Sequence, residues 1–215
     1  MLGGGSGLAQ QGFRFSQPEP DEAAADAARQ RQVAQQLSTP CRAELKNRKI
    51  VVIIGERQGN GYIDARQQNY GPHFQAINGR LRALGLATYT PEDIRKQIAQ
   101  AEIDAYFRND PDAALAAAKR LGASFVLRGL ITADATVNPV MRVNQVAVTM
   151  GFTLSEAGGR VISDASAHSA SYSGADVAAM ALTLVNENAD DVVARLYADY
   201  CTGAGLAPAG RPRGK

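Results

Sequence analysis

The stretch DPDAALAAAKRLGASFVLRGL, from Asp110 to Leu130, decides the fold. Its first half has apolar side chains at helical spacing, and Gly122 suits the position just after a helix end. The apolar positions are Ala114, Leu115, Ala118 and Leu121. Its second half is a short apolar run that is typical of a buried strand. An amphipathic helix therefore leads directly into a strand, which favours a domain in which helices pack on a sheet.

Strands and helices alternate on the N-terminal side of this stretch. Residues 49–54 (KIVVII) predict a buried, β-branched strand, residues 72–84 a helix that ends at Gly85, and residues 86–89 a short strand. Thr90 is expected to cap a further helix, with Asp93 as its capping-box partner. That helix would present Ile94, Ile98, Ala101 and Ala105 to the core. Asn109 or Asp110 is the expected cap of the helix that follows.

Three strands and a helix are predicted on the C-terminal side. Residues 124–136 form the first strand, and residues 143–156 form a second with alternating apolar side chains at Val146, Val148, Met150, Phe152 and Leu154. A turn at Gly158 and Gly159 leads to a hairpin partner over residues 160–173, whose small, polar half from residue 163 suits a sheet edge. Residues 176–200 form the closing helix. The order β-α-β-α-α-β-β-β-α predicts an α+β fold with a mixed sheet and helices packed on it.

The chain divides into one domain and flanking segments. We expect a flexible leader over residues 1–20, an N-terminal helix within 21–40, the α+β domain over 41–201 and a disordered tail over 202–215. The N-terminal helix has only Val33 and Leu37 as large apolar residues. In the leader, Gly7 and Ala9 suit a signal-peptidase site, but a basic start and an apolar core are missing. A remnant of an export signal and a simple flexible leader both stay open.

Composition limits the possible functions. The 215 residues carry a net charge of +2 with charges of both signs interspersed, which does not favour nucleic acid as a partner. No run of apolar residues is long enough to span a bilayer.

Two cysteines, Cys41 and Cys201, stand at opposite ends of the predicted domain. Two buried, unpaired thiols are one interpretation. A disulfide is favoured because both residues lie in polar boundary segments, and it would close a loop of about 160 residues in an oxidising compartment. Two Cys and two His at scattered positions lack the paired spacing of a metal site. Cys41 follows Pro40, so it does not resemble a lipidated cysteine.

The motifs for catalysis and cofactor binding are incomplete. The loop after the first strand, residues 55–69, is polar and Gly-rich, but Gly61 is followed by Tyr62 and not by the Lys of a phosphate-binding loop. His73 and His168 have no neighbouring partner in the sequence that would activate a nucleophile. The Ser-rich residues 163–173 lack the G-x-S-x-G pattern of a hydrolase. We therefore expect no enzyme activity and no cofactor.

Four segments between Lys49 and Tyr200 carry a family resemblance. They are KIVVII (49–54), LRALGLATYTPEDI (81–94), DPDAALAAAKRLGASFVLRGLIT (110–132) and VTMGFTLSEAGGRVIS (148–163). In order and pattern they resemble a bacterial envelope superfamily. It includes the curli secretion lipoprotein, lipoprotein activators of penicillin-binding proteins, the middle domain of the flagellar H-ring T protein and the N-terminal domain of the Tol propeller protein. The resemblance implies a binding or assembly module.

The expected function is that of a non-enzymatic assembly or accessory protein of a cell-envelope machine, such as a secretion channel, flagellar ring or pilus. It would act in the periplasm, with or without association with the outer membrane, as a homo-oligomer or part of a larger ring of envelope proteins. One alternative is a regulator that docks on a peptidoglycan synthase. Another is an enzyme that binds a nucleotide or small ligand at residues 55–61. The expected partner-binding residues are Arg57, Gln58, Asn60, Tyr62, Arg66, Ser169, Ser171 and Tyr172.

Overall fold

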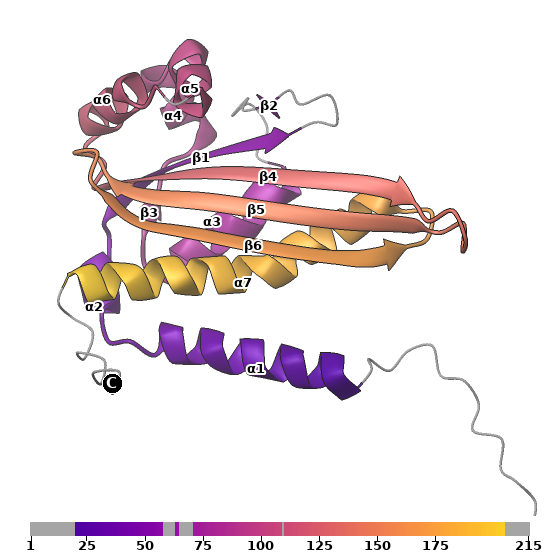
Figure 1. Cartoon of the computed structure of the whole chain (residues 1–215). Helices are drawn as coiled ribbons and strands as arrows, with labels where there is room; N and C mark the ends of the chain where they lie inside the picture. Colours follow the sequence, from indigo (N-terminus) through magenta and orange to yellow (C-terminus); the bar gives the residue numbers. More distant parts are fainter. Residues whose placement is uncertain (1–19, 58–62, 65–70, 109, 205–215) are drawn as a thin grey trace, which may run out of the picture.

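A mixed β-sheet with helices on both faces forms the centre of the molecule (Figure 1). The computed structural model describes residues 20–57, 63–64, 71–108 and 110–204. The strands are β1 (Lys49–Arg57), β2 (Ile63–Asp64), β3 (Ala87–Thr88), β4 (Phe125–Val137), β5 (Asn144–Glu156) and β6 (Val161–Ser173). The helices are α1 (Pro20–Leu37), α2 (Arg42–Leu45), α3 (Pro72–Ala83), α4 (Pro91–Gln97), α5 (Gln100–Phe107), α6 (Asp112–Arg120) and α7 (Val177–Gly203). The predicted α+β class with a mixed sheet is confirmed.

The described strands follow the order β2-β1-β4-β5-β6, and β3 pairs with the start of β1. β1 runs parallel to β3 and β4, whereas β4, β5 and β6 form an antiparallel meander. The register between β4 and β5 is unbroken from the pair Phe125–Glu156 to the pair Val137–Asn144. The helix of the opening stretch is α6, and it leads into β4 as predicted.

The larger core lies between the sheet and the helices α3 and α7 (Figure 1). The alternating side chains of β5 are all buried in it, as predicted: Val146, Val148, Met150, Phe152 and Leu154. α7 contributes an apolar stripe that includes Leu184, Val185, Val192 and Leu196. The closing helix predicted over residues 176–200 therefore covers this face of the sheet.

A second, smaller core lies on the opposite face of the sheet. There Val51 and Ile53 of β1 and Val126 of β4 pack against α4, α5 and α6. β1 therefore has buried side chains on both faces, which explains its continuous β-branched sequence.

The helix predicted after Thr90 is two helices. Thr90 and Asp93 form the predicted capping box, but α4 ends at Gln97 and Ile98 has extended backbone angles. Glu102 then accepts a hydrogen bond of 2.8 Å from the backbone N–H of Ala99, which starts α5. The break turns Ala101 outward, although it was predicted to face the core, while Ile98 stays buried.

Several boundaries also differ from the prediction. β1 continues to Arg57, because its second half still pairs with β4, so Gly55 belongs to the strand and not to a loop. Pro111 is the N-cap residue of α6 and has no capping side chain. The predicted cap at Asp110 is therefore wrong, and Asn109 lies outside the described residues. α7 continues two residues past Cys201, to Gly203.

A disulfide joins Cys41 to Cys201, with the Cα atoms 5.8 Å apart. The Tyr197 hydroxyl lies beside it, accepts a hydrogen bond of 3.2 Å from the Cys41 N–H and donates one to the carbonyl of Thr39. The segment that enters β1 is thus fixed against the end of α7, as the positions of the two cysteines suggest.

Candidate interaction surface

The residues predicted to contact partners lie at the end of the first strand and on the last strand. Arg57 is the last residue of β1, and its side chain is exposed. Gln58, Asn60, Tyr62 and Arg66 lie outside the described residues. Their role as contact residues stays a prediction.

The predicted residues of β6 alternate between the two faces of the sheet. Ser169 and Ser171 lie on the face covered by α7, and the amide of Asn188 donates a hydrogen bond of 2.6 Å to the Ser169 hydroxyl. Tyr172 lies on the opposite face and is 51% exposed. The three residues therefore share a strand but not a side-chain surface. What they have in common is the outer edge of β6.

The outer edge of β6 is the unpaired backbone of residues 163–173. β6 pairs with β5 on one side, and no described strand lies on its other side. A register shift at Leu154 and Ser155 places a bulge at the start of β6, after which the pairing continues without a break from Ser163 to Ser173. Asp164 is the only carboxylate of the strand, which has no Lys, Arg or Pro. The residues that commonly block an exposed edge are therefore nearly absent.

The sheet face opposite α7 carries short polar side chains next to this edge. Thr132, Thr149 and His168 form a row of paired residues across β4, β5 and β6, and the Thr149 hydroxyl lies 3.0 Å from Nδ1 of His168. Two same-face pairs further along β5 and β6, the Thr153 hydroxyl donates a hydrogen bond of 2.6 Å to Asp164. The sequence alternation predicts this outward face, but not the contacts between its members.

The hairpin between β4 and β5, at one end of the sheet, carries exposed apolar side chains. Val137, Val140 and Met141 are 64%, 87% and 54% exposed. The Asn138 side chain accepts hydrogen bonds of 2.9 and 3.0 Å from the backbone N–H groups of Val140 and Met141, which defines the shape of the turn. The tip adjoins the end of β6, since Asn144 pairs with Ser173.

Both histidines have partners from distant parts of the chain, which their sequence neighbours do not reveal. Nδ1 of His73 at the start of α3 lies 3.1 Å from Oε1 of Glu56 near the end of β1. His168 contacts Thr149, as described above. In the described residues, neither pair has a third member that would complete a catalytic triad.

The described residues offer neither a metal site nor a membrane-spanning helix. They contain no group of three or more His, Cys, Asp or Glu side chains that could hold a metal ion. No helix among them combines the length and apolarity needed to cross a membrane.

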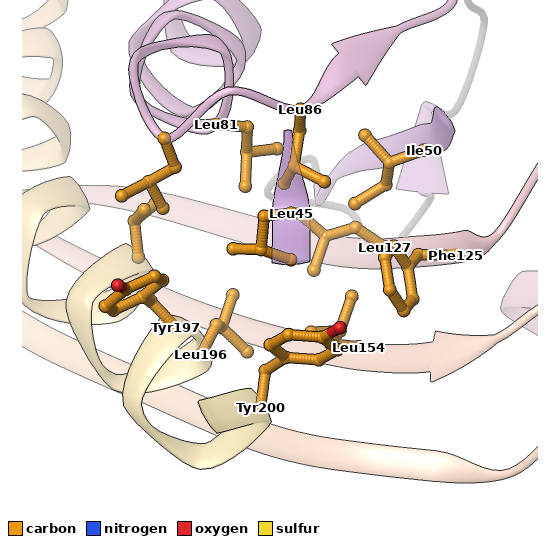
Figure 2. Close-up of a pocket in the computed structure, with 12 residues that line it drawn as sticks. Leu45, Ile50, Leu81, Leu86, Phe125, Leu127, Leu154, Leu196, Tyr197 and Tyr200 are labelled. Carbon is orange, nitrogen blue, oxygen red and sulfur yellow. The ribbon is translucent and has the colours of Figure 1, made fainter. Parts of the chain in front are cut away.

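An internal cavity of about 20 Å³ lies between the sheet, α2, α3 and the C-terminal part of α7. Figure 2 shows Leu196, Tyr197 and Tyr200 of α7 on one side of it, with Phe125 and Leu127 of β4 opposite. Phe125 and Tyr200 meet edge to face, with ring centroids 5.4 Å apart. A cavity of this size holds about one water molecule and has an apolar lining, so it is part of the core and not a ligand site.

Comparisons with known proteins gave matches among solved structures alone. No family model matches the chain, and no curated protein matches it. The PelC dodecamer from Paraburkholderia phytofirmans is 16% identical, with 68% of this chain and 89% of that chain covered and a TM-score of 0.40. Lipoprotein GNA1162 from Neisseria meningitidis is 14% identical, with 64% and 92% covered and a TM-score of 0.41. The LpoB C-terminal domain from Salmonella enterica is 17% identical, with 67% and 96% covered and a TM-score of 0.40.

Proposed function

We propose that this protein is a non-enzymatic assembly or accessory protein of a bacterial cell-envelope machine, and that it acts through protein–protein contacts. The observation that carries the proposal is the outer edge of β6, which is long, regular and without a described partner strand. The proposed machines are those expected from the sequence: a secretion channel, a flagellar ring or a pilus system.

An exposed strand edge is a template for another strand. Each unpaired backbone N–H and C=O group can bond to a partner, and a strand with alternating side chains adds pockets that give specificity. Apart from Asp164, His168 and Tyr172, the side chains along residues 163–173 are Ser and Ala, which lets a second backbone approach closely. The row of Thr149 and His168 and the exposed Tyr172 would then contact side chains of the added strand.

The disulfide supports the proposed location. Disulfides persist in oxidising compartments such as the bacterial periplasm and are rare in the cytosol. The Cys41–Cys201 bond therefore favours the periplasm, where envelope machines are assembled.

The test compares the size of the native complex for three forms of the protein in envelope extracts of the bacterium. Ser166→Lys with Ala170→Lys adds two charges beside the outer edge of β6, where both side chains are exposed. Ala101→Lys with Ala116→Lys adds the same charge at exposed positions of α5 and α6. We expect the wild type and the α5–α6 variant in a large complex, and the β6 variant at its own mass of 22.7 kDa.

Thermal melting of the purified variants serves as the control for folding, since all four side chains are exposed. A β6 variant that melts like the wild type and still enters the complex would refute the role of this edge. A wild-type protein found at its own mass in the extract would count against an assembly function altogether.

A further inference from the structure

A cavity of about 200 Å³ lies on the sheet face opposite α7, where α5 and α6 meet the ends of β4 and β5. Its polar lining comes from Arg128, Thr153 and Ser155, and its apolar lining includes Leu115 and Val161. The turn between β5 and β6 closes one side through Gly159. The cavity is smaller than typical drug-sized pockets of roughly 300–1,000 Å³, which suits a small group or the end of a chain.

Arg128 is the only charged residue among those that line the cavity. Its guanidinium lies 5.5 Å from the ring centroid of Tyr106, and its Nη1 donates a hydrogen bond of 3.3 Å to the Tyr106 carbonyl. No carboxylate in the described part of the chain forms an ion pair with it. A guanidinium has five N–H donors, and most of those of Arg128 therefore have no acceptor among the described residues. A half-buried charge of this kind is stabilised when an anion pairs with it.

The surrounding groups hold this guanidinium in place. The Tyr106 ring lies against it in a cation–π contact, and burial raises the pKa of the Tyr106 phenol. Because Arg128 pairs with Thr153 in the β4–β5 register, the stem of its side chain starts from a rigid central strand. The N–H donors of the Arg128 guanidinium are therefore held in a fixed geometry before a ligand binds.

The charge balance around the cavity selects the class of anion. Asp164 is bonded to Thr153, so one negative charge already lies on the strand next to the cavity. A single guanidinium opposed by a nearby carboxylate suits a monoanion better than a doubly charged phosphate. The planar fork of Arg matches the two oxygens of a carboxylate, and Leu115 and Val161 offer apolar contact to whatever carries that carboxylate.

We propose that this cavity binds a carboxylate that carries a small apolar group, with Arg128 on the carboxylate and Leu115 and Val161 on the apolar group. Two sources have this chemistry: the C-terminal residue of a peptide chain and a short free acid. The inference goes beyond the proposed assembly function and does not depend on the outer edge of β6.

The test is a titration of the full, isotope-labelled protein followed by NMR chemical shifts of Gly159 and Ser155. The probes are N-acetyl-Ala-Ala with a free carboxylate, the same dipeptide as its C-terminal amide, isobutyrate and inorganic phosphate. We expect both carboxylates to shift these signals, and the amide and phosphate to leave them unchanged. Tighter binding of the dipeptide identifies a chain terminus as the source, and tighter binding of isobutyrate identifies a free acid.

Four variants separate charge from geometry. We expect Arg128→Gln to weaken carboxylate binding at least tenfold and Arg128→Lys to weaken it several-fold, because Lys keeps the charge but not the fork. Asp164→Asn should strengthen binding, because it removes the opposing charge. Arg195→Gln, on α7 at the other face of the sheet, removes the same charge and should change nothing.

Three results would overturn the inference: no shifts with either carboxylate at millimolar concentration, equal binding of the dipeptide acid and its amide, or unchanged binding in a folded Arg128→Gln protein. Weaker binding in Asp164→Asn would equally contradict it, because Asp164 would then be part of the site. None of these results bears on complex formation through β6, so the two proposals fail separately.

Discussion

At the scale of single residues, Gly129 and Phe152 form a close contact between β4 and β5. The two residues are directly paired, and a Cβ atom built on Gly129 would lie 2.2 Å from the Phe152 ring. The ring itself is buried, with 3% of its surface exposed. The absence of a side chain at position 129 is therefore what lets the ring lie across the neighbouring strand.

This contact predicts a strong coupling between two substitutions. We expect Gly129→Ala to cost about 1–3 kcal/mol through overpacking and Phe152→Ala about 3–5 kcal/mol through the lost core ring. The double variant should cost clearly less than the sum, because the new methyl group then has room. Urea denaturation of the four proteins measures the cycle. Additive costs would show that the two side chains do not compete for space.

Thr90 and Asp93 predict a local pH effect at the start of α4. Hydrogen bonds from the Thr90 side chain and backbone hold the pKa of Asp93 below its ordinary value, and Lys96 lowers the pKa further. Because the folded pKa is the lower one, the contribution to stability is present above the unfolded pKa and is lost as pH falls through the folded pKa. NMR titration should show the Asp93 pKa rising more in Thr90→Val than in Lys96→Gln. The reverse order would mean that charge, and not the capping box, sets this pKa.

At the scale of elements, sequence patterns predict the strands better than the helix boundaries. The alternation of β5 predicts the strand and its buried face, because one face is buried in the core and the other is open. Apolar side chains therefore occupy one face and polar side chains the other. The break at Ile98 escapes prediction because Ile94, Ile98, Ala101 and Ala105 also fit one continuous helix. The extended backbone at Ile98 and Ala99 and the hydrogen bond from the Ala99 N–H to Glu102 distinguish the two cases, and the residue types alone do not reveal them because Glu also suits a helix interior.

α1 contacts the rest of the domain chiefly through α7. Its large apolar side chains are the half-buried Val33 and Leu37, and a groove of about 490 Å³, lined by apolar and charged side chains, lies between α1 and the middle of α7. Deleting the chain up to Leu37 should therefore lower the free energy of unfolding by only about 1–2 kcal/mol, from the apolar area that the two residues bury. Val33→Ala with Leu37→Ala should reproduce most of this loss. Loss of a cooperative melt in the truncated protein would show instead that α1 is part of the core.

At the scale of the whole molecule, the disulfide connects the two ends of the domain. Cys41 precedes β1 and Cys201 lies near the end of α7, 160 positions later. The chain-entropy model gives about 5 kcal/mol for a loop of this length. We expect replacement of both cysteines by Ala, or reduction with dithiothreitol, to lower the urea midpoint of the wild type by a corresponding amount. Reduction should have no effect on the double variant. Equal midpoints for oxidised and reduced wild type would contradict a structural role for this bond.

The candidate surface can be predicted from the sequence only in part. The small, polar sequence of residues 163–173 predicts an edge strand, because such residues seldom form a central one. The Arg128 cavity could not be predicted, because Tyr106, Arg128 and Gly159 come together only through the packing of α5 and the register of the meander. The one feature of the sequence that could indicate this cavity is the charged Arg128 within an otherwise apolar stretch of β4.

The central claim is that the outer edge of β6 pairs with a partner strand in the assembled state. Hydrogen exchange measures this directly, because a backbone N–H group exchanges slowly when it is paired. The experiment compares the native complex with the isolated Ser166→Lys, Ala170→Lys variant as the unassembled reference. We predict that residues 163–173 exchange more slowly in the complex, while residues 100–120 in α5 and α6 exchange alike in both. Equal exchange of residues 163–173 in the two states would contradict the account.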